Sequence, residues 1–154
     1  MGMLAMTLTF AMTIASLASP AAKAKHAALV SVESRVAAKK LEIVDPKAVV
    51  RSDLERELAR IDWKKEGVAQ PFELTAVLAS AESSANKKGA TASCLIEVVL
   101  REPNGKILGT VRGHASGEEA KGSREALERG VLDAAAKTAS SAIPEAVRRS
   151  RDVK

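Results

Sequence analysis

An apolar residue stands at every second position from Cys94 to Leu100, with Ile96 and Val98 between them. Side chains on a β-strand point alternately to its two faces, so these four would share one face. The intervening residues are mixed in character. This pattern is typical of a strand buried on one side and half-covered on the other, and it predicts the middle strand of a sheet.

A tight turn follows at residues 102–105, Glu-Pro-Asn-Gly. Pro103 restricts its own φ, Asn104 tolerates unusual backbone angles, and Gly105 adopts a positive φ at little cost. Either a type I turn with a glycine bulge or a two-residue Asn-Gly turn fits these residues. Both predict that the returning strand, residues 106–115, runs antiparallel to the middle strand.

Glycine recurs on one face of the returning strand, at Gly109 and Gly113. Glycine inside a strand usually marks the close approach of another backbone. We therefore expect the helix that follows to cross this face closely. A third strand is predicted from Phe72 to Ser80, with Phe72, Leu74, Ala76 and Leu78 on one side, and a polar loop from Glu82 to Ala92 is expected to join it to the middle strand.

Helical spacing of apolar residues predicts a first helix from Val49 to Trp63, after a turn or helix start at Asp45-Pro46. On its polar side, Asp53/Arg56 and Glu57/Arg60 are opposite charges at i,i+3. Trp63 is interpreted as a core or edge anchor, with ligand stacking as the alternative. Upstream, residues 26–40 could begin a strand or a short helix, and Leu41 to Val44 is predicted to be a strand.

A second helix is predicted from Ala120 to Val147, with a stripe rich in small residues that suits close packing. Its start is expected either at a capping box formed by residues 116–119 or after Gly122, with Ser123 as N-cap. Pro144 should kink the helix or begin a new turn. The basic end, residues 148–154, is interpreted as a solvated tail, with contact to anionic lipid or an acidic partner as the alternative.

Residues 1–24 have the layout of an export signal: an almost uncharged run from Met3 to Ala18, then Ala22-Lys23-Ala24 as a small-x-small cleavage pattern. A retained anchor is the alternative, although about sixteen residues are few for a spanning helix. Residues 25–154 are then expected to form a single domain. One cysteine, Cys94, cannot form an internal disulfide and is expected to be buried and inert.

Composition limits the chemistry. The net charge is +5, and there are two histidines and three aromatic residues. His26 and His114 lie far apart without metal-ligand spacing, no serine stands in a Gly-x-Ser-x-Gly elbow, and no glycine-rich phosphate loop is present. Nucleic-acid binding usually needs a basic patch with stacking aromatics. We therefore expect no catalytic residues, no metal, no cofactor and no nucleic-acid partner.

The segment from Phe72 to Val147 resembles bacterial envelope helper domains of the curli-secretion lipoprotein type and the N-terminal module of TolB-like proteins. The likeness rests on the Phe-Glu-Leu-Thr-Ala strand at residues 72–76, the strand pair around Pro103-Asn104-Gly105, and the helix running into Pro144. It implies an exported α+β sandwich that acts in protein binding or assembly. The chain departs from the lipoproteins in having no cysteine near its expected cleavage point.

The predicted fold is a two-layer α+β sandwich: an antiparallel sheet of three to four strands with two helices on one face. The opposite face is the candidate partner-binding surface, and its residues are Leu95, Glu97, Val99, Leu108, Thr110 and Arg112.

The leading hypothesis is a non-catalytic binding or assembly module, periplasmic or secreted, whose partner is another envelope protein. One alternative is a small envelope enzyme or enzyme inhibitor, which predicts a deep polar pocket near Glu97, Arg112 and His114. The other alternative is a self-associating structural protein. Membrane contact is expected only through the basic tail or an uncleaved signal.

Overall fold

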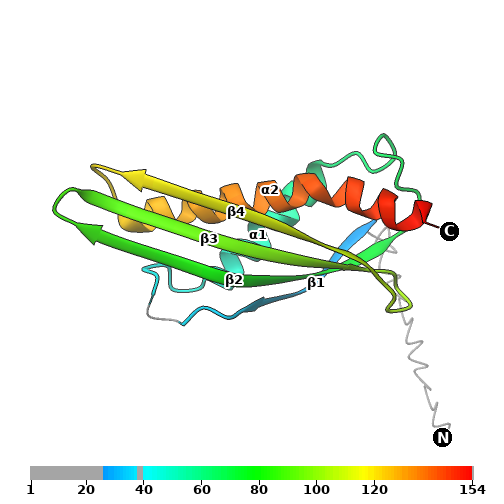
Figure 1. The fold of residues 1–154 in the computed structure, drawn as a ribbon, viewed down its shortest axis with the longest axis horizontal. Coiled ribbons are helices and arrows are strands. Elements are labelled where there is room, and N and C mark those ends of the chain that lie inside the picture. Colours follow the sequence, from blue (N-terminus) through cyan, green and yellow to red (C-terminus); the bar gives the residue numbers. More distant parts are fainter. Residues whose placement is uncertain (1–25, 38–39, 154) are drawn as a thin grey trace, which may run out of the picture.

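The computed structural model describes residues 26–37 and 40–153, so the expected export signal lies outside the described residues. The elements, in chain order, are β1 (Ala27–Ser34), α1 (Pro46–Arg60), β2 (Phe72–Asn86), β3 (Gly89–Arg101), β4 (Ile107–Glu119) and α2 (Arg124–Asp152). Figure 1 shows one twisted sheet with both helices behind it. The predicted α+β class, with two helices on one face of a sheet, is confirmed.

The strands follow the order β1-β2-β3-β4. Antiparallel pairing joins β2 to β3 and β3 to β4, whereas β1 pairs with β2 in parallel. The sheet is therefore mostly antiparallel, and β1 departs from the fully antiparallel arrangement that the sequence led us to expect. The reason is topological: α1 stands between β1 and β2, and a crossover through a helix brings the chain back in the same direction.

The first strand occupies part of the segment that the sequence left ambiguous. The predicted strand from Leu41 to Val44 is wrong, because these residues form irregular structure between β1 and α1. Their backbone donors are used elsewhere: the N–H groups of Glu42 and Ile43 donate to the carboxylate of Glu128 on α2. A side chain thus replaces the neighbouring strand as the hydrogen-bond partner.

The β2–β3 hairpin is longer than predicted. The expected polar loop from Glu82 to Ala92 is wrong, because pairing continues from Glu82 opposite Ser93 to Asn86 opposite Gly89. Two features hid this pairing. The helix-facing positions are alanines, such as Ala81 and Ala92, which are buried but only weakly hydrophobic. A register irregularity between residues 78 and 80 also interrupts the alternation.

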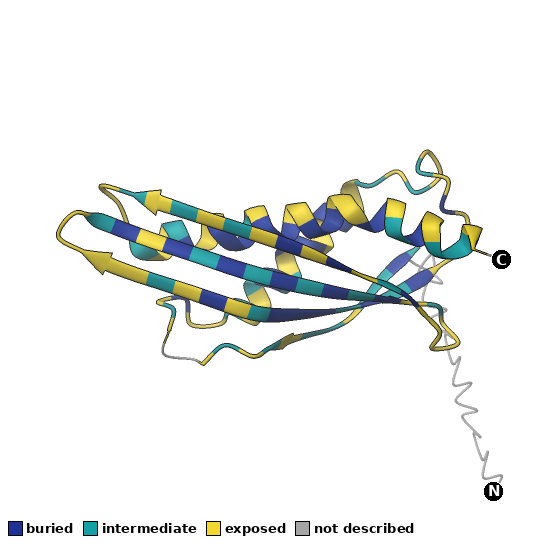
Figure 2. Cartoon of the chain, viewed as in Figure 1, coloured by how far each residue is buried: buried dark blue, intermediate teal, exposed yellow. Residues whose placement is uncertain are grey.

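The predicted face of the middle strand is confirmed. The side chains of Ile96, Val98 and Leu100 are fully buried, and Cys94 is 2 % exposed. Phe72, Leu74, Ala76 and Leu78 of β2 are buried with them. Figure 2 shows the resulting alternation of buried and less buried residues along the strands.

The glycine prediction holds at one of its two positions. A Cβ at Gly113 would lie 1.9 Å from the carbonyl oxygen of Ala135, so α2 packs directly against the β4 backbone there. No atom lies within 4 Å of the corresponding position at Gly109, so no backbone packs closely against the strand there. The close crossing of helix and strand is therefore fixed near the middle of β4.

Both helices begin at capped ends. Asp45 accepts from the N–H of Ala48 and Pro46 occupies the first turn of α1, while Ser123 accepts from the N–H of Ala126 at α2. Of the two predicted starts of the second helix, Ser123 is the observed N-cap, and residues 116–119 belong to β4. Pro144 lies inside α2, which continues to Asp152.

The first helix ends at Arg60, three residues earlier than predicted, and Trp63 lies beyond it. The two expected ion pairs of α1 are present: Asp53 with Arg56 at 3.1 Å and Glu57 with Arg60 at 3.0 Å. Both carboxylates lie on the α2 side of the helix rather than in open solvent, since Asp53 is 8 % exposed and Glu57 9 %. Burial is the largest influence on Asp53 and raises its pKa.

Candidate binding surface

The face of the sheet opposite the helices is uncovered by any described element (Figure 1). Register places its side chains in rows across the strands, for example Val77, Glu97 and Arg112 in one row and Thr75, Val99 and Thr110 in the next. We call this surface the outer face. Glu97 and Arg112 form a cross-strand ion pair of 2.9 Å.

Five of the six predicted partner-binding residues lie on the outer face: Leu95, Glu97, Val99, Thr110 and Arg112. Leu108 does not belong with them, because it lies at a register irregularity between β3 and β4 and is buried in the core at 8 % exposure. An irregularity of this kind changes which face a residue meets, and the sequence pattern did not reveal it.

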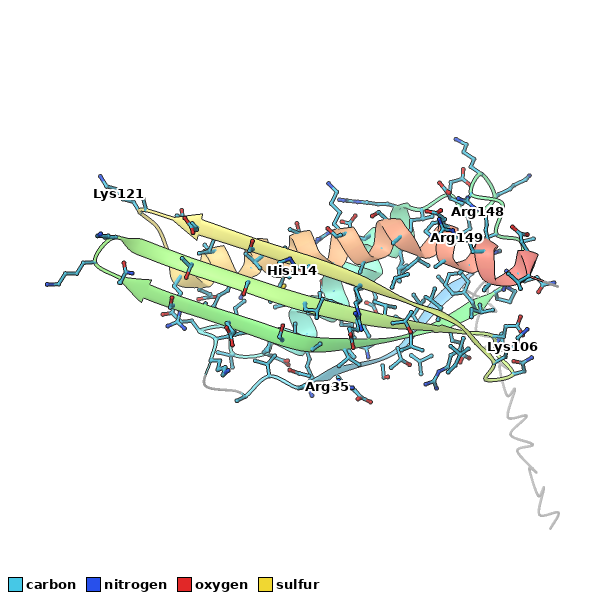
Figure 3. The ribbon with its side chains drawn as sticks, viewed as in Figure 1. Arg35, Lys106, His114, Lys121, Arg148 and Arg149 are labelled. Carbon is cyan, nitrogen blue, oxygen red and sulfur yellow. The ribbon has the colours of Figure 1, made fainter. Side chains whose placement is uncertain are left out.

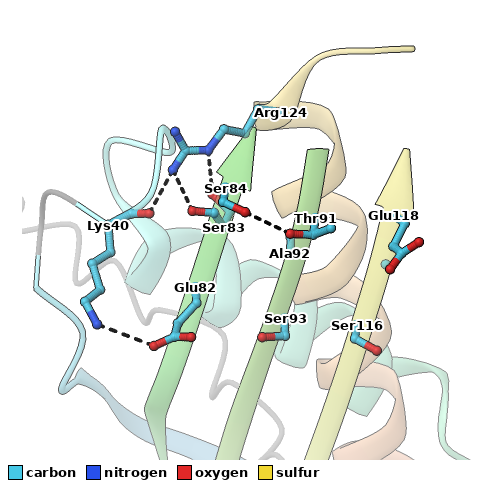
Figure 4. Close-up of a pocket in the computed structure, with 11 residues that line it drawn as sticks. Lys40, Glu82, Ser83, Ser84, Thr91, Ala92, Ser93, Ser116, Glu118 and Arg124 are labelled. Atoms are coloured by element: carbon cyan, nitrogen blue, oxygen red, sulfur yellow. Dashed lines mark hydrogen bonds and ion pairs between the residues drawn. The ribbon is translucent and has the colours of Figure 1, made fainter. Parts of the chain in front are cut away.

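The half of the outer face nearer the β3–β4 turn carries apolar side chains. Val77 is buried between its neighbours, Leu95 and Val99 are half-buried, and Ile107 is 61 % exposed. The half nearer the β2–β3 turn is rich in hydroxyl groups. A groove of about 850 Å³ lies there, lined in part by Ser84, Thr91, Ser93, Ser116 and Glu118 (Figure 4). The outer face is thus divided into an apolar part and a polar part.

A buried polar network closes the helix side of this groove. The Glu128 side chain is 1 % exposed and accepts hydrogen bonds from the N–H groups of Glu42 and Ile43, at 2.9 and 3.1 Å, and from the hydroxyl of Ser83. Arg124 lies 3.3 Å from the Glu128 carboxylate and donates to the carbonyl oxygen of Ser83 at 3.0 Å. Figure 4 shows Arg124 reaching across to Ser83 and Lys40.

Sequence reasoning missed this network, because Arg124 and Glu128 lie outside the apolar stripe that the sequence predicts for this helix. Their i,i+4 spacing was visible, but such a pair is usually exposed and weak. Only the packing of the segment around Glu42 against α2 makes Glu128 a buried residue. It joins three parts of the chain that are distant in sequence.

The enzyme alternative predicts a deep polar pocket at Glu97, Arg112 and His114. The three residues do share the outer face, and Figure 3 marks His114 near the middle of β4. The Arg112 side chain is 70 % exposed, so it is not enclosed as a deep pocket would require. Among residues 26–37 and 40–153, no group of three or more His, Cys, Asp or Glu side chains could hold a metal ion.

The single cysteine is buried as predicted. The Cys94 thiol donates to the carbonyl oxygen of Val131 at 3.4 Å, and burial raises its pKa to about 12. Because the thiolate is the nucleophile, a thiol with so high a pKa is unreactive near neutrality.

Trp63 serves as an anchor at the other end of the core. Its ring packs edge-on against Phe72 at a centroid distance of 5.2 Å and lies stacked with His26 at 6.3 Å. A cavity of about 320 Å³ adjoins it, lined by β1 and α1 residues that include Leu29 and Leu58. The anchor interpretation is confirmed, and the alternative of ligand stacking stays a prediction.

The described part of the basic end, residues 148–153, is not a free tail. Residues up to Asp152 are helical, Arg148 pairs with Glu66 at 3.0 Å, and Arg151 donates to the carbonyl oxygen of Gln70 at 3.3 Å. These contacts tie the end of α2 to the connection between α1 and β2. Figure 3 places Arg148 and Arg149 at this end of the molecule and Lys121 at the opposite end.

No protein-family model matches the chain, and no curated protein matches it either. Solved structures do match. A candidate lipoprotein from Caulobacter crescentus superposes with a TM-score of 0.51 at 14 % identity, covering 84 % of this chain and 93 % of that one. A DUF330-family protein from Xanthomonas campestris superposes with a TM-score of 0.50 at 9 % identity, covering 82 % and 88 %.

At such low identity these matches establish a shared fold. The chain therefore has the fold of a candidate bacterial lipoprotein and of the DUF330 protein. Neither structure is a curli-secretion lipoprotein or a TolB-like protein, so that finer resemblance stays a prediction. Among the described residues, no helix is both long and apolar enough to cross a membrane.

Proposed function

We propose that this chain is a non-catalytic module of the bacterial envelope that binds another envelope protein through the outer face of its sheet. The observation that carries the proposal is that the helices cover only one of the two faces of the sheet. Both helices pack on one face of the sheet, while the other face is left uncovered and combines half-buried apolar side chains with polar ones. Uncovered apolar surface bordered by polar residues is typical of protein interaction sites.

Two further observations support the envelope setting. The first 24 residues have the layout of an export signal. One of the matching folds belongs to a candidate bacterial lipoprotein. The proposed compartment is the periplasm or the exterior of the cell, and the proposed role is binding or assembly.

Within the outer face, the center of the proposed contact is the row of Thr75, Val99 and Thr110 with the neighbouring ion pair of Glu97 and Arg112. Val99 is half-buried by its own neighbours and still open to a partner. A central apolar side chain, here Val99, bordered by polar and charged groups is the usual anatomy of a specific interface.

Site-directed photo-crosslinking in living cells tests the proposal. A photoreactive residue at position 99 should give a specific adduct with an envelope protein, and the adduct should be lost when Leu95→Asp is added to weaken the apolar surface. The matched control is position 137, exposed on α2. Equal labelling at positions 99 and 137, or no adduct at 99 in a folded chain, would overturn the proposal. Fractionation of the same cells tests the compartment separately.

A further inference from the structure

The two edge strands of the sheet, β1 and β4, differ in length and in how far the helices cover them. β1 has eight residues, and α1 packs against it. β4 has thirteen residues, and α2 lies beneath its inner face without covering its edge. Among the described residues, no hydrogen bond from another element reaches the main chain along that edge. A long edge strand with free N–H and C=O groups is a template for pairing with another strand.

One contact shows which residues of β4 direct their main-chain N–H and C=O groups toward β3 and which direct them toward the open edge. The carbonyl oxygen of Ser83 accepts from Arg124, so Ser83 points away from β3. Ala92, opposite Ser83, therefore bonds toward β4, where it meets Gly117. Main-chain direction alternates along a strand, so the even-numbered residues of β4 present their N–H and C=O groups to the open edge. These residues are Thr110, Arg112, His114, Ser116 and Glu118.

We propose that two copies of this chain pair antiparallel along β4, with Ala115 of each copy at the two-fold axis. In this register Arg112, which pairs with Glu97 of its own chain at 2.9 Å, also faces Glu118 of the other copy, and Glu118 faces Arg112, so two further cross-strand ion pairs form. His114 faces Ser116 in the same way. All of these residues are even-numbered and exposed, as the pairing requires. Opposite charges directly across a strand pair are stabilising.

Neighbouring registers do not share this complementarity. Shifting the axis to residue 114 puts Arg112 opposite Ser116, and shifting it to residue 116 puts Arg112 opposite Ala120. Both shifts keep the hydrogen bonds and lose both ion pairs. The charges therefore favour one register among those that the backbone hydrogen bonds allow. The strand that complements them is β4 of a second copy of this chain.

The helix layer leaves room for this arrangement. Arg129, Asp133 and Lys137 line the groove between α2 and α1, and Ala135 meets Gly113. Helical geometry then directs Ala134 and Thr138 toward the open side of β4, where both are exposed. Small side chains at these positions let the α2 helices of two copies approach beneath the joined sheet. The pairing uses main-chain groups of the edge, whereas the partner proposed for the outer face contacts side chains; Arg112 belongs to both surfaces.

Charge reversal gives the first test, with the monomer–dimer equilibrium measured by sedimentation. Glu118→Arg should weaken self-association by about tenfold or more, because it turns two attractive pairs into repulsive ones and leaves the Glu97–Arg112 pair in place. Arg112→Glu should weaken it as well, and it also removes the pair with Glu97. The double reversal should restore self-association. The control is Arg101→Glu, an exposed change on β3 away from the edge. A wild-type chain that stays monomeric at every concentration, or a double reversal that does not recover, would refute the pairing.

Cysteine cross-linking tests the register itself. In the proposed dimer, residue 114 of one copy lies directly opposite residue 116 of the other, within the span of a disulfide. Mixing His114→Cys with Ser116→Cys protein should therefore give a covalent heterodimer, whereas neither variant alone should cross-link efficiently. Wild-type chain, which retains buried Cys94, is the blank. Efficient cross-linking by His114→Cys alone would place the axis at residue 114 and would overturn this register.

Discussion

Truncation of Glu128 should be the most destabilising single change in the polar network. The carboxylate takes hydrogen bonds from the N–H groups of Glu42 and Ile43 and from the hydroxyl of Ser83, in a site where its side chain is 1 % exposed. Glu128→Ala removes the acceptor for all three donors and leaves Arg124 without its buried partner. The segment that leads into α1 would lose the hydrogen bonds that the N–H groups of Glu42 and Ile43 make to α2.

The magnitude follows from the donors left without partners. An unsatisfied buried donor costs roughly 1–3 kcal/mol, and water reaching the vacated site would recover part of it. We expect a loss of about 3–5 kcal/mol in the free energy of unfolding. That is a large share of the roughly 5–15 kcal/mol that holds an ordinary domain together.

Urea unfolding followed by circular dichroism measures this loss directly. The matched control is Glu125→Ala, about one turn earlier on α2, where the glutamate is exposed and pairs, among the described residues, with Arg129 at i,i+4. That pair should contribute no more than about 0.5 kcal/mol. If the Glu128 and Glu125 variants lost the same stability, the network would not be the attachment that its geometry indicates.

Three further predictions concern the core. Gly113→Ala should destabilise the protein by about 1–3 kcal/mol or more, because the added Cβ meets α2 backbone, while Gly109→Ala should change stability little, and thermal unfolding of the two variants compares them. The folded-state pKa of Cys94 is raised to about 12 from 9.0, so its contribution to stability is complete below about pH 9 and is lost as the pH rises from there toward 12. Thiol titration at pH 8 should detect Cys94 only after denaturant is added, and rapid labelling of folded protein would contradict its burial. Trp63→Ala should cost about 3–5 kcal/mol through lost packing on Phe72, and an unchanged denaturation midpoint would show that the ring is not an anchor.

The elements with strong local signals were predictable. Alternation from Cys94 to Leu100 and the Pro103-Asn104-Gly105 turn identified the β3–β4 hairpin, because strand periodicity and turn chemistry act over a few residues. Both helices were predicted for the same reason, although their starts were left open: Asp45 was a turn or helix start, and Ser123 was one of two possible N-caps. The outer face was recognised from the same alternation, apart from Leu108.

The sequence-based predictions that were wrong share a different cause. Pairing of residues 82–92 depends on alanines that are hydrophobic enough only once α2 covers them, and the local pattern was broken by the irregularity near Leu78. Leu41 to Val44 is apolar enough for a strand, yet its donors go to Glu128, which is more than eighty residues away in sequence. Nothing in either segment alone carries this information.

The amino-acid sequence by itself determined the faces of the strands, the turn, the two helices and the burial of Cys94, since each follows from side-chain chemistry repeated over a few neighbouring positions. Tertiary structure decided the parallel placement of β1, the burial of Glu128 and the open edge of β4. These depend on which distant segments compete for the same backbone groups, and that competition is resolved only when the layers pack against each other.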